Sequence, residues 1–143
     1  MKIDKVLMSE YADVVNVWEA SVRATHHFLS EEDIRFFKPR ILHEYLACVN
    51  LRCIRNPEDK IEGFIGVNRE IIEMLFVRPE AFGKGIGKKL LQFAITEMKA
   101  TELYVNEENP PAIGFYQHFG FKIVARSETD PSGKPYPVLH MAL

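Results

Sequence analysis

The sequence has 143 residues, 47% of them hydrophobic and 27% charged, which predicts one compact domain spanning residues 1–143. Its 18 Lys and Arg against 20 Asp and Glu give a formal net charge of -2, which argues against nucleic acid or an anionic membrane as a partner. No signal-peptide pattern and no run of about 18 apolar residues occurs, so we expect a soluble, cytoplasmic protein.

Two helices are predicted after a short strand at residues 3–8. Apolar side chains recur at the helical period over residues 11–22, and Ser9 can cap this first helix. Ser30 is followed by three acidic residues, which favours the start of a second helix. This second helix should end before Asn50.

A β-hairpin and a buried strand are predicted next. Residues 51–54 and 61–67 are rich in strand-forming residues, and the sequence Asn-Pro-Glu-Asp between them favours a turn. The apolar run at residues 69–77 hardly alternates, which predicts a central strand covered on both faces. Cys48 and Cys53 have neither CxxC nor zinc spacing, so we expect reduced core residues, as in an intracellular protein.

The second half of the chain predicts alternating helices and strands. A helical pattern covers residues 85–100 and another covers residues 110–119, with a short strand at 102–105 between them. Two further strands, at 121–128 and 137–143, flank the turn sequence Asp-Pro-Ser-Gly. This order of elements predicts a mixed α/β fold.

The segment VRPEAFGKGIGKK, residues 77–89, lies between the buried strand and the first turn of a helix. A helix start has unpaired N–H groups, and glycines let an anion approach them without meeting a Cβ atom. Lys84, Lys88 and Lys89 add local positive charge. The segment therefore indicates a phosphate site, the alternative being a tightly packed glycine turn with solvated lysines.

The spacing of the glycines separates three phosphate-binding loops. A Walker loop is excluded because Lys89 stands at its Ser/Thr position and Phe82 at its first glycine. A dinucleotide-binding loop is excluded because Lys88 takes the place of its third glycine. The remaining pattern, from Phe82 to Gly87, resembles the acyl-CoA loop of the GNAT N-acetyltransferase superfamily, [QR]xxGx[GA]. Phe82 replaces the usual Gln or Arg, which should matter less than losing Gly85 or Gly87.

A second segment, NEENPPAIGFYQHFGF at residues 106–121, resembles the later GNAT motif NxxAxxFYxxxGF. Asn109 suits the helix N-cap, the two prolines after it suit the first turn, and Gly120 suits the helix end. Tyr116 matches the tyrosine of the motif, the alternative being a packed core tyrosine.

The resemblance implies a single-domain GNAT-like α/β (α+β) fold, with a mixed, mostly antiparallel twisted sheet of about seven strands flanked by about four helices. It implies an N-acetyltransferase that uses acetyl-CoA as co-substrate and no metal. The acceptor would be an amine-bearing small molecule, peptide or protein, and the chain a monomer or homodimer. A non-catalytic acyl-CoA sensor or protein-interaction module on the same fold is the alternative.

The resemblance also implies a donor site built from strand main chain, the glycine loop and the last helix. The cofactor-binding residues expected on this basis are Leu75, Phe76, Val77, Phe82, Gly83, Lys84, Gly85, Ile86, Gly87, Lys88, Asn109 and Tyr116.

Direct transfer of an acetyl group to a primary amine needs two proton transfers. An amine with a pKa of about 10.4 must lose a proton, and the departing thiolate benefits from receiving one. Tyr116 matches the general acid of many GNAT relatives. Glu73, a carboxylate in the apolar strand, is the predicted general base, directly or through water. The alternative is that Glu73 has no catalytic role and only faces solvent beside Arg69 or Arg78.

The acceptor site is predicted from two segments, THHFL and GKPYP, that resemble a small stand-alone bacterial GNAT subfamily. Thr25, His26, Phe28 and Tyr136 are its candidate substrate-binding residues. His26 can assist proton removal, or it can serve only as a packing or capping residue. Whether Glu73, His26 or water is the base stays open. The other histidines lack metal-ligand spacing with Cys, Asp or Glu, so no metal site is expected.

Overall fold

The computed structural model of the chain describes residues 1–143. Its strands are β1 (Ile3–Lys5), β2 (Asn50–Arg55), β3 (Ile61–Asn68), β4 (Ile71–Val77), β5 (Glu102–Asn106), β6 (Lys122–Ser127) and β7 (Val138–Ala142). Its α-helices are α1 (Tyr11–Thr25), α2 (Glu31–Arg40), α3 (Ile86–Thr96) and α4 (Pro110–His118). Short 3-10 turns at Met8–Glu10, Leu46–Cys48 and Pro79–Ala81 and a π turn at Ile41–Tyr45 complete the list.

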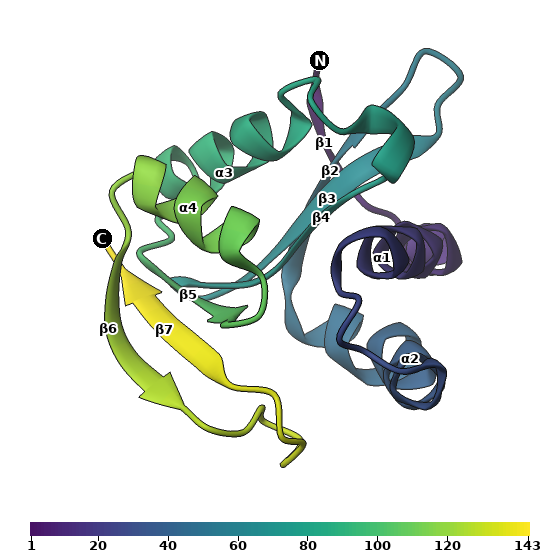
Figure 1. Cartoon of the computed structure of the whole chain (residues 1–143). Helices are drawn as coiled ribbons and strands as arrows, with labels where there is room; N and C mark the ends of the chain where they lie inside the picture. Colours follow the sequence, from purple (N-terminus) through teal and green to yellow (C-terminus); the bar gives the residue numbers. More distant parts are fainter.

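The strands form one seven-stranded sheet in the order β1-β2-β3-β4-β5-β7-β6. All neighbours are antiparallel except β4 and β5, which run parallel. Helices α1 and α2 lie on one face of the sheet and α3 and α4 on the other (Figure 1). The predicted fold, a mostly antiparallel sheet of about seven strands with about four helices, is confirmed.

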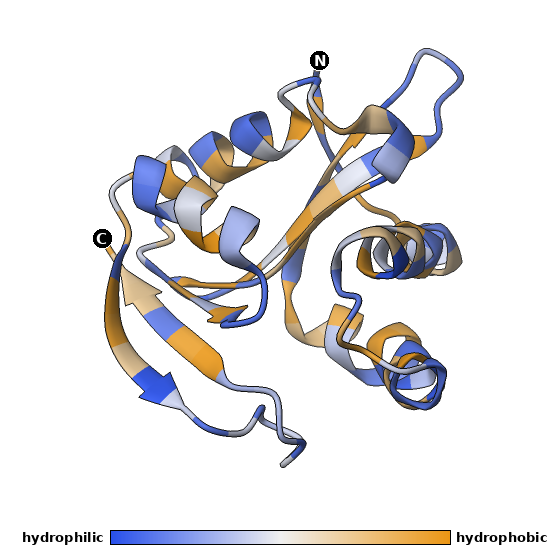
Figure 2. Ribbon diagram, viewed as in Figure 1, coloured by the Kyte–Doolittle hydropathy of each residue, from blue (hydrophilic) through white to orange (hydrophobic).

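Two hydrophobic clusters, one on each face, hold these layers together. The larger cluster packs α3 and α4 against the sheet and includes Leu90 and Phe121. The other packs α1 and α2 against the opposite face and includes Trp18 and Phe64. Figure 2 shows that the helices carry both hydrophobic and hydrophilic stretches, as helices with one buried side must.

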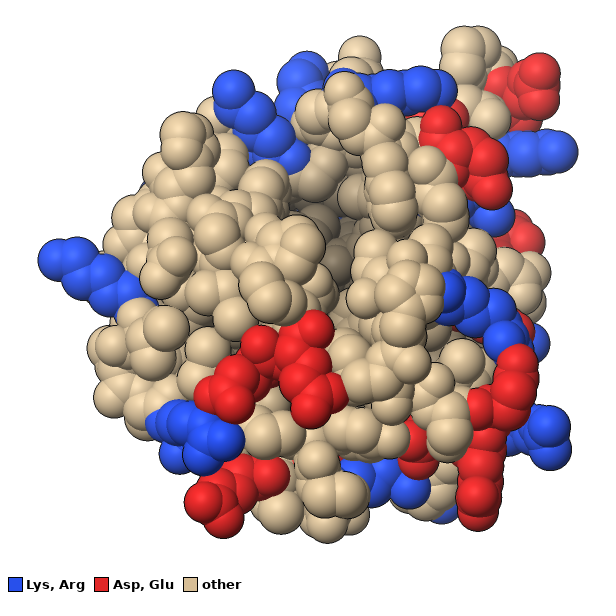
Figure 3. Space-filling view, in the orientation of Figure 1, with Lys and Arg blue, Asp and Glu red and all other residues tan.

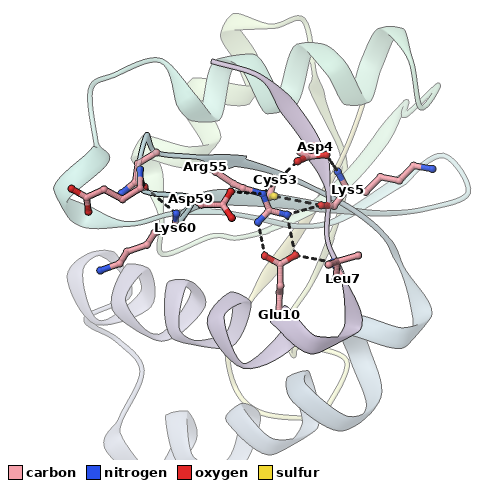
Figure 4. Close-up of polar contacts among 10 residues, drawn as sticks. Asp4, Lys5, Leu7, Glu10, Cys53, Arg55, Asp59 and Lys60 are labelled. Atoms are coloured by element: carbon pink, nitrogen blue, oxygen red, sulfur yellow. Dashed lines mark hydrogen bonds and ion pairs between the residues drawn. The ribbon is translucent and has the colours of Figure 1, made fainter.

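Arg55, at the end of β2, ties β1 and the turn before α1 to the sheet. Its guanidinium donates to Glu10 Oε1 at 2.9 Å and to the main-chain oxygen of Lys5 at 2.9 Å, and pairs with Asp4 at 3.4 Å (Figure 4). Hydrogen bonds from Arg55 and from the Leu7 amide hold the pKa of the Glu10 carboxyl below its usual range.

The two predicted caps of the N-terminal helices had different outcomes. Ser30 caps α2 as predicted, because its Oγ accepts the amide of Asp33 at 3.1 Å and the Asp33 carboxylate accepts the Ser30 amide in return. The Ser9 cap is wrong, because a 3-10 turn occupies Met8–Glu10 and Glu10 takes the N-cap position. The first strand consequently ends at Lys5.

Two further predictions need correction. Helix α3 ends at Thr96 rather than near Ala100, because Lys99 turns into the left-handed region with φ of 59°. Cys53 is buried as expected, but Cys48 is exposed, since it lies on a 3-10 turn that buries Leu46 instead. Both thiols are free. None of the helices has both the length and the apolar character needed to span a bilayer.

Candidate active site

A cleft of about 680 Å³ opens where β4 and β5 separate. The two strands pair only through Ile71 and Ile72, opposite Glu102 and Leu103, so the rest of the β4 edge is left without β5 beside it. Figure 3 shows a hollow bordered mainly by uncharged side chains, with basic groups above it and acidic groups below it. The volume is in the range that holds a small molecule or cofactor.

Glu73 lies at the point where β4 leaves β5. Its two neighbours in β4 pair with Val67 and Gly66, which leaves Glu73 as the extra residue of a β-bulge. Glu73 lines the cleft and forms no ion pair, and partial burial raises the pKa of its carboxyl above the usual range. The prediction that both faces of this strand are covered is wrong for residues 74–77, which are only partly buried because they border the cleft.

The loop between β4 and α3 brings main-chain amides to the cleft. Gly83 and Gly85 have φ of 79° and 81°, in the left-handed region, and a Cβ added to either would meet no atom within 4 Å. None of the main-chain N–H groups of residues 83–88 donates a hydrogen bond within the chain. These amides are free to bind an anion at the positive end of the α3 dipole.

The lysines of this loop differ in their surroundings. Lys88 lines the cleft together with Phe82 and the three glycines, whereas Lys84 does not. The Nζ of Lys89 donates to the main-chain oxygen of Met1 at 3.0 Å. Lys88 is therefore the one lysine of this loop that lines the cleft.

Helix α4 contributes Tyr116 and Asn109 to the cleft. Burial of Tyr116 raises the pKa of its hydroxyl well above the usual range. The Tyr116 hydroxyl makes no hydrogen bond to a protein atom. Every fully buried polar side-chain atom of the chain does have a partner, so this hydroxyl is not fully buried and is accessible from the cleft. Asn109 is the N-cap residue as predicted, but its side chain makes no capping hydrogen bond and stays free. Gly120, with φ of 97°, follows the helix end as predicted.

Thr25 and His26 line the cleft from the end of α1. The hydroxyl of Thr25 donates to the main-chain oxygen of Ser21 at 2.8 Å and lies 2.7 Å from His26 Nδ1. Burial, with a smaller contribution from His27, lowers the pKa of His26 to about 4, so its imidazole is neutral at pH 7.

Phe28 lies next to His26 and Tyr136 lies next to Phe28, and neither of the two aromatic residues lines the cleft. The ring of His26 lies 5.2 Å from Phe28, which lies 5.6 Å from Tyr136. The hydroxyl of Tyr136 donates to the carboxylate of Asp33 on α2. Of the four predicted acceptor residues, Thr25 and His26 line the cleft, whereas Phe28 and Tyr136 pack behind His26 with tilted rings.

Residues of β5 that were not predicted as site residues also reach the cleft. Tyr104, Val105 and Asn106 line it, and Val105 packs in the hydrophobic core as well. The ring of Tyr104 stacks on His140 at 4.6 Å, and His140 Nε2 lies 2.7 Å from Glu102. No group of three His, Cys, Asp or Glu side chains that could hold a metal ion occurs.

The chain is similar in sequence to known acetyltransferases over most of its length. Residues 23–123 match the family model of the acetyltransferase (GNAT) domain. The peptidyl-lysine N-acetyltransferase YjaB of Salmonella typhimurium is 38% identical over 128 residues, covering 90% of this chain and 88% of that protein. YjaB of Escherichia coli is 37% identical over 133 residues, covering 93% and 90%.

Solved structures agree with this similarity. The solution structure of apo YjaB from Escherichia coli has a TM-score of 0.87 and 35% identity, covering 99% of this chain and 95% of that one. PaiA N-acetyltransferase from Thermoplasma acidophilum, solved in complex with coenzyme A, has a TM-score of 0.75 and 24% identity, covering 99% and 98%. The similarity to PaiA is one of fold alone.

Proposed function

Because the chain belongs to the GNAT family of acetyltransferases, we propose that it transfers the acetyl group of acetyl-CoA to lysine side chains of peptides or proteins. The YjaB relatives, which match almost the whole chain, are named peptidyl-lysine N-acetyltransferases. The observation that carries the proposal is one cleft that joins free main-chain amides, Tyr116 and Glu73.

The donor half of the cleft is the side that contains the glycine loop. In this proposal the unpaired amides of residues 83–88 bind the diphosphate of acetyl-CoA, and Lys88 adds positive charge beside them. The pantetheine arm lies along the β4 edge at Leu75, Phe76 and Val77, which is accessible because β5 diverges there. The free side chain of Asn109 and the exposed ring of Phe82 border the same half.

Two side chains carry the proton transfers in this proposal. Glu73 takes a proton from the lysine ammonium, directly or through water, and the neutral nitrogen then attacks the thioester carbon. Tyr116 gives its proton to the coenzyme A sulfur as the carbon–sulfur bond breaks, and the second proton that the nitrogen loses on forming the amide passes through water to the Tyr116 phenolate, which restores the acid. The raised pKa of Glu73 makes it a stronger base than an ordinary glutamate, and the raised pKa of Tyr116 keeps its proton in place at neutral pH.

An amine panel tests the proposal. The purified chain is given acetyl-CoA with lysine-containing peptides, the same peptides with norleucine in place of lysine, polyamines and aminoglycosides, and coenzyme A release is followed. Lysine peptides should turn over and their norleucine counterparts should not. Turnover with small amines alone would overturn the peptide acceptor. A blank panel, with acetyl-CoA still bound in calorimetry, would indicate an acyl-CoA sensor instead.

A further inference from the structure

The hydrogen bonds around Thr25 fix where the proton of His26 sits. A threonine hydroxyl has one proton to donate, and Thr25 Oγ1 gives it to the main-chain oxygen of Ser21 at 2.8 Å. Toward His26 Nδ1, which is 2.7 Å away, Thr25 can therefore act only as an acceptor. This arrangement favours the tautomer with the hydrogen on His26 Nδ1, in which the neutral ring has its lone pair on Nε2.

That lone pair has no partner in the protein. His26 Nε2 takes part in no hydrogen bond of the chain. Because every fully buried polar side-chain atom has a partner, Nε2 is not fully buried, and it is accessible where His26 lines the cleft. The ring is held from two sides by Phe28, at 5.2 Å between centroids, and by Phe76 of β4, at 6.2 Å. An acceptor atom is thus held in a fixed direction beside β4.

We infer that Thr25 and His26 form a positioning pair, in which Thr25 holds His26 in the Nδ1–H tautomer and His26 Nε2 accepts a hydrogen bond from the acceptor amine. The inference rests on the proposed function, since it assigns this pair to the lysine side of the same cleft. Thr25 acts only through His26, whereas His26 touches the acceptor.

The charge state of His26 suits this role. A neutral imidazole does not repel an incoming lysine ammonium, and the lowered pKa of His26 keeps the ring neutral. In this assignment His26 orients the nitrogen, and Glu73 keeps the role of base that the proposed function gives it.

Nitrogen-15 NMR of the imidazole tests the tautomer without any turnover. In the unmodified protein at pH 7, His26 should show a protonated Nδ1 and an unprotonated Nε2. Thr25→Val removes the acceptor and should shift the ring toward the Nε2–H tautomer, whereas Thr25→Ser should restore the original pattern. A ring already protonated at Nε2, or a tautomer that ignores Thr25→Val, would overturn the inference.

Kinetics and titration test the contact with the amine. His26→Phe keeps an aromatic ring but removes the acceptor, so KM for a lysine peptide should rise roughly tenfold or more while KM for acetyl-CoA stays the same. His27→Phe is the matched control at an exposed neighbour and should leave both constants unchanged. An unchanged peptide KM in His26→Phe would reject the contact.

A binding measurement separates this inference from the proposed function. Adding a lysine peptide in the presence of coenzyme A should move the His26 Nε2 resonance, and the norleucine peptide should not. If that shift occurs without turnover, the proposed activity fails and the amine contact stands. If lysine peptides turn over without moving the resonance, the positioning role fails and the activity stands.

Discussion

The hydroxyl of Tyr116, the proposed general acid, provides a test of whether the cleft catalyses a reaction or only binds acetyl-CoA. Tyr116→Phe should lower kcat by roughly 100-fold or more, because the coenzyme A sulfur loses its proton donor. Acetyl-CoA affinity, measured by calorimetry, should change little, since phenylalanine keeps the ring of Tyr116 in the cleft and the hydroxyl holds no protein group in place. Tyr45→Phe, at an exposed tyrosine, serves as the control. A kcat equal to that of the control would remove Tyr116 from the mechanism.

Two glycines with the same backbone conformation test the phosphate loop. Gly85 and Gly133 have φ of 81° and 84°, and neither has an atom within 4 Å of an added Cβ. Alanine at either position should lower the free energy of unfolding by about 1 kcal/mol, because left-handed backbone disfavours a Cβ. Gly85→Ala alone should also weaken acetyl-CoA binding in calorimetry, since its Cβ enters the space beside the free amides. Equal affinities in the two variants would contradict a phosphate site there.

In the proposed mechanism, the carboxyl of Glu73 sets the pH at which activity appears. A protonated Glu73 cannot accept the amine proton, so kcat/KM should fall as pH drops through the pKa of Glu73. Because burial raises that pKa, the fall should lie above the value of about 4.3 for an ordinary glutamate.

Substitution of Glu73 tests this assignment. Glu73→Gln should lower kcat/KM at pH 7 by roughly 100-fold and abolish the acidic limb of the pH profile. Glu70→Gln, on the exposed turn before β4, should keep the limb. A limb that survives in Glu73→Gln would assign the base to another group or to water alone.

At the scale of elements, the segment between β6 and β7 is fastened to α2 through Asp33. Tyr136 donates to the carboxylate of Asp33, and Lys134 Nζ lies 3.0 Å from its other oxygen. The hydrogen bond from Tyr136, with further bonds from Lys134 and Ser30, lowers the pKa of Asp33 to about 2. This junction holds Tyr136 beside Phe28, whose ring in turn packs on His26.

Tyr136→Phe tests how much this junction stabilises the fold. The variant should lose about 1–3 kcal/mol of unfolding free energy at pH 7 in urea titrations, the value for a hydrogen bond to a charged group. Asp33 has a lower pKa folded than the value of about 3.9 unfolded, so its contribution is complete above about pH 3.9 and disappears as pH falls through about 2. The difference between the two proteins should therefore shrink in acid. A constant difference across pH would contradict the ionised partner.

At the scale of the whole molecule, the two hydrophobic clusters share one sheet and should unfold together. Trp18, the single tryptophan, lies in the α1 cluster, and Leu90 lies in the cluster on the opposite face. Leu90→Ala should cost about 2–5 kcal/mol and lower the urea midpoint equally in Trp18 fluorescence and in far-UV circular dichroism. A shift in circular dichroism alone would mean that the two faces unfold separately and that the chain is not one domain.

Several features held by contacts between near neighbours in sequence could be predicted from the sequence, although the cap at Ser9 was not among them. Ser30 and Asp33 cap a helix across one turn, and the glycine loop follows from its own residues and the helix after it. These predictions needed no knowledge of the sheet.

Features set by pairing between distant segments could not be predicted in this way. The bulge at Glu73 and the divergence of β4 from β5 depend on how three strands align, and they decide which side chains reach the cleft. Tyr104 and Ser21 were missed for that reason, because neither stands out until β5 and α1 are seen beside β4.

The exposed thiol of Cys48 has a practical consequence for the amine panel. Chromogenic disulfide reagents that detect released coenzyme A also react with accessible cysteines, whereas burial raises the pKa of Cys53 to about 11 and protects it. Such an assay should begin with a rapid colour burst of about one equivalent per chain, before any amine is added. Cys48→Ser, on a surface turn away from the cleft, should give a flat baseline against which slow acceptors become measurable.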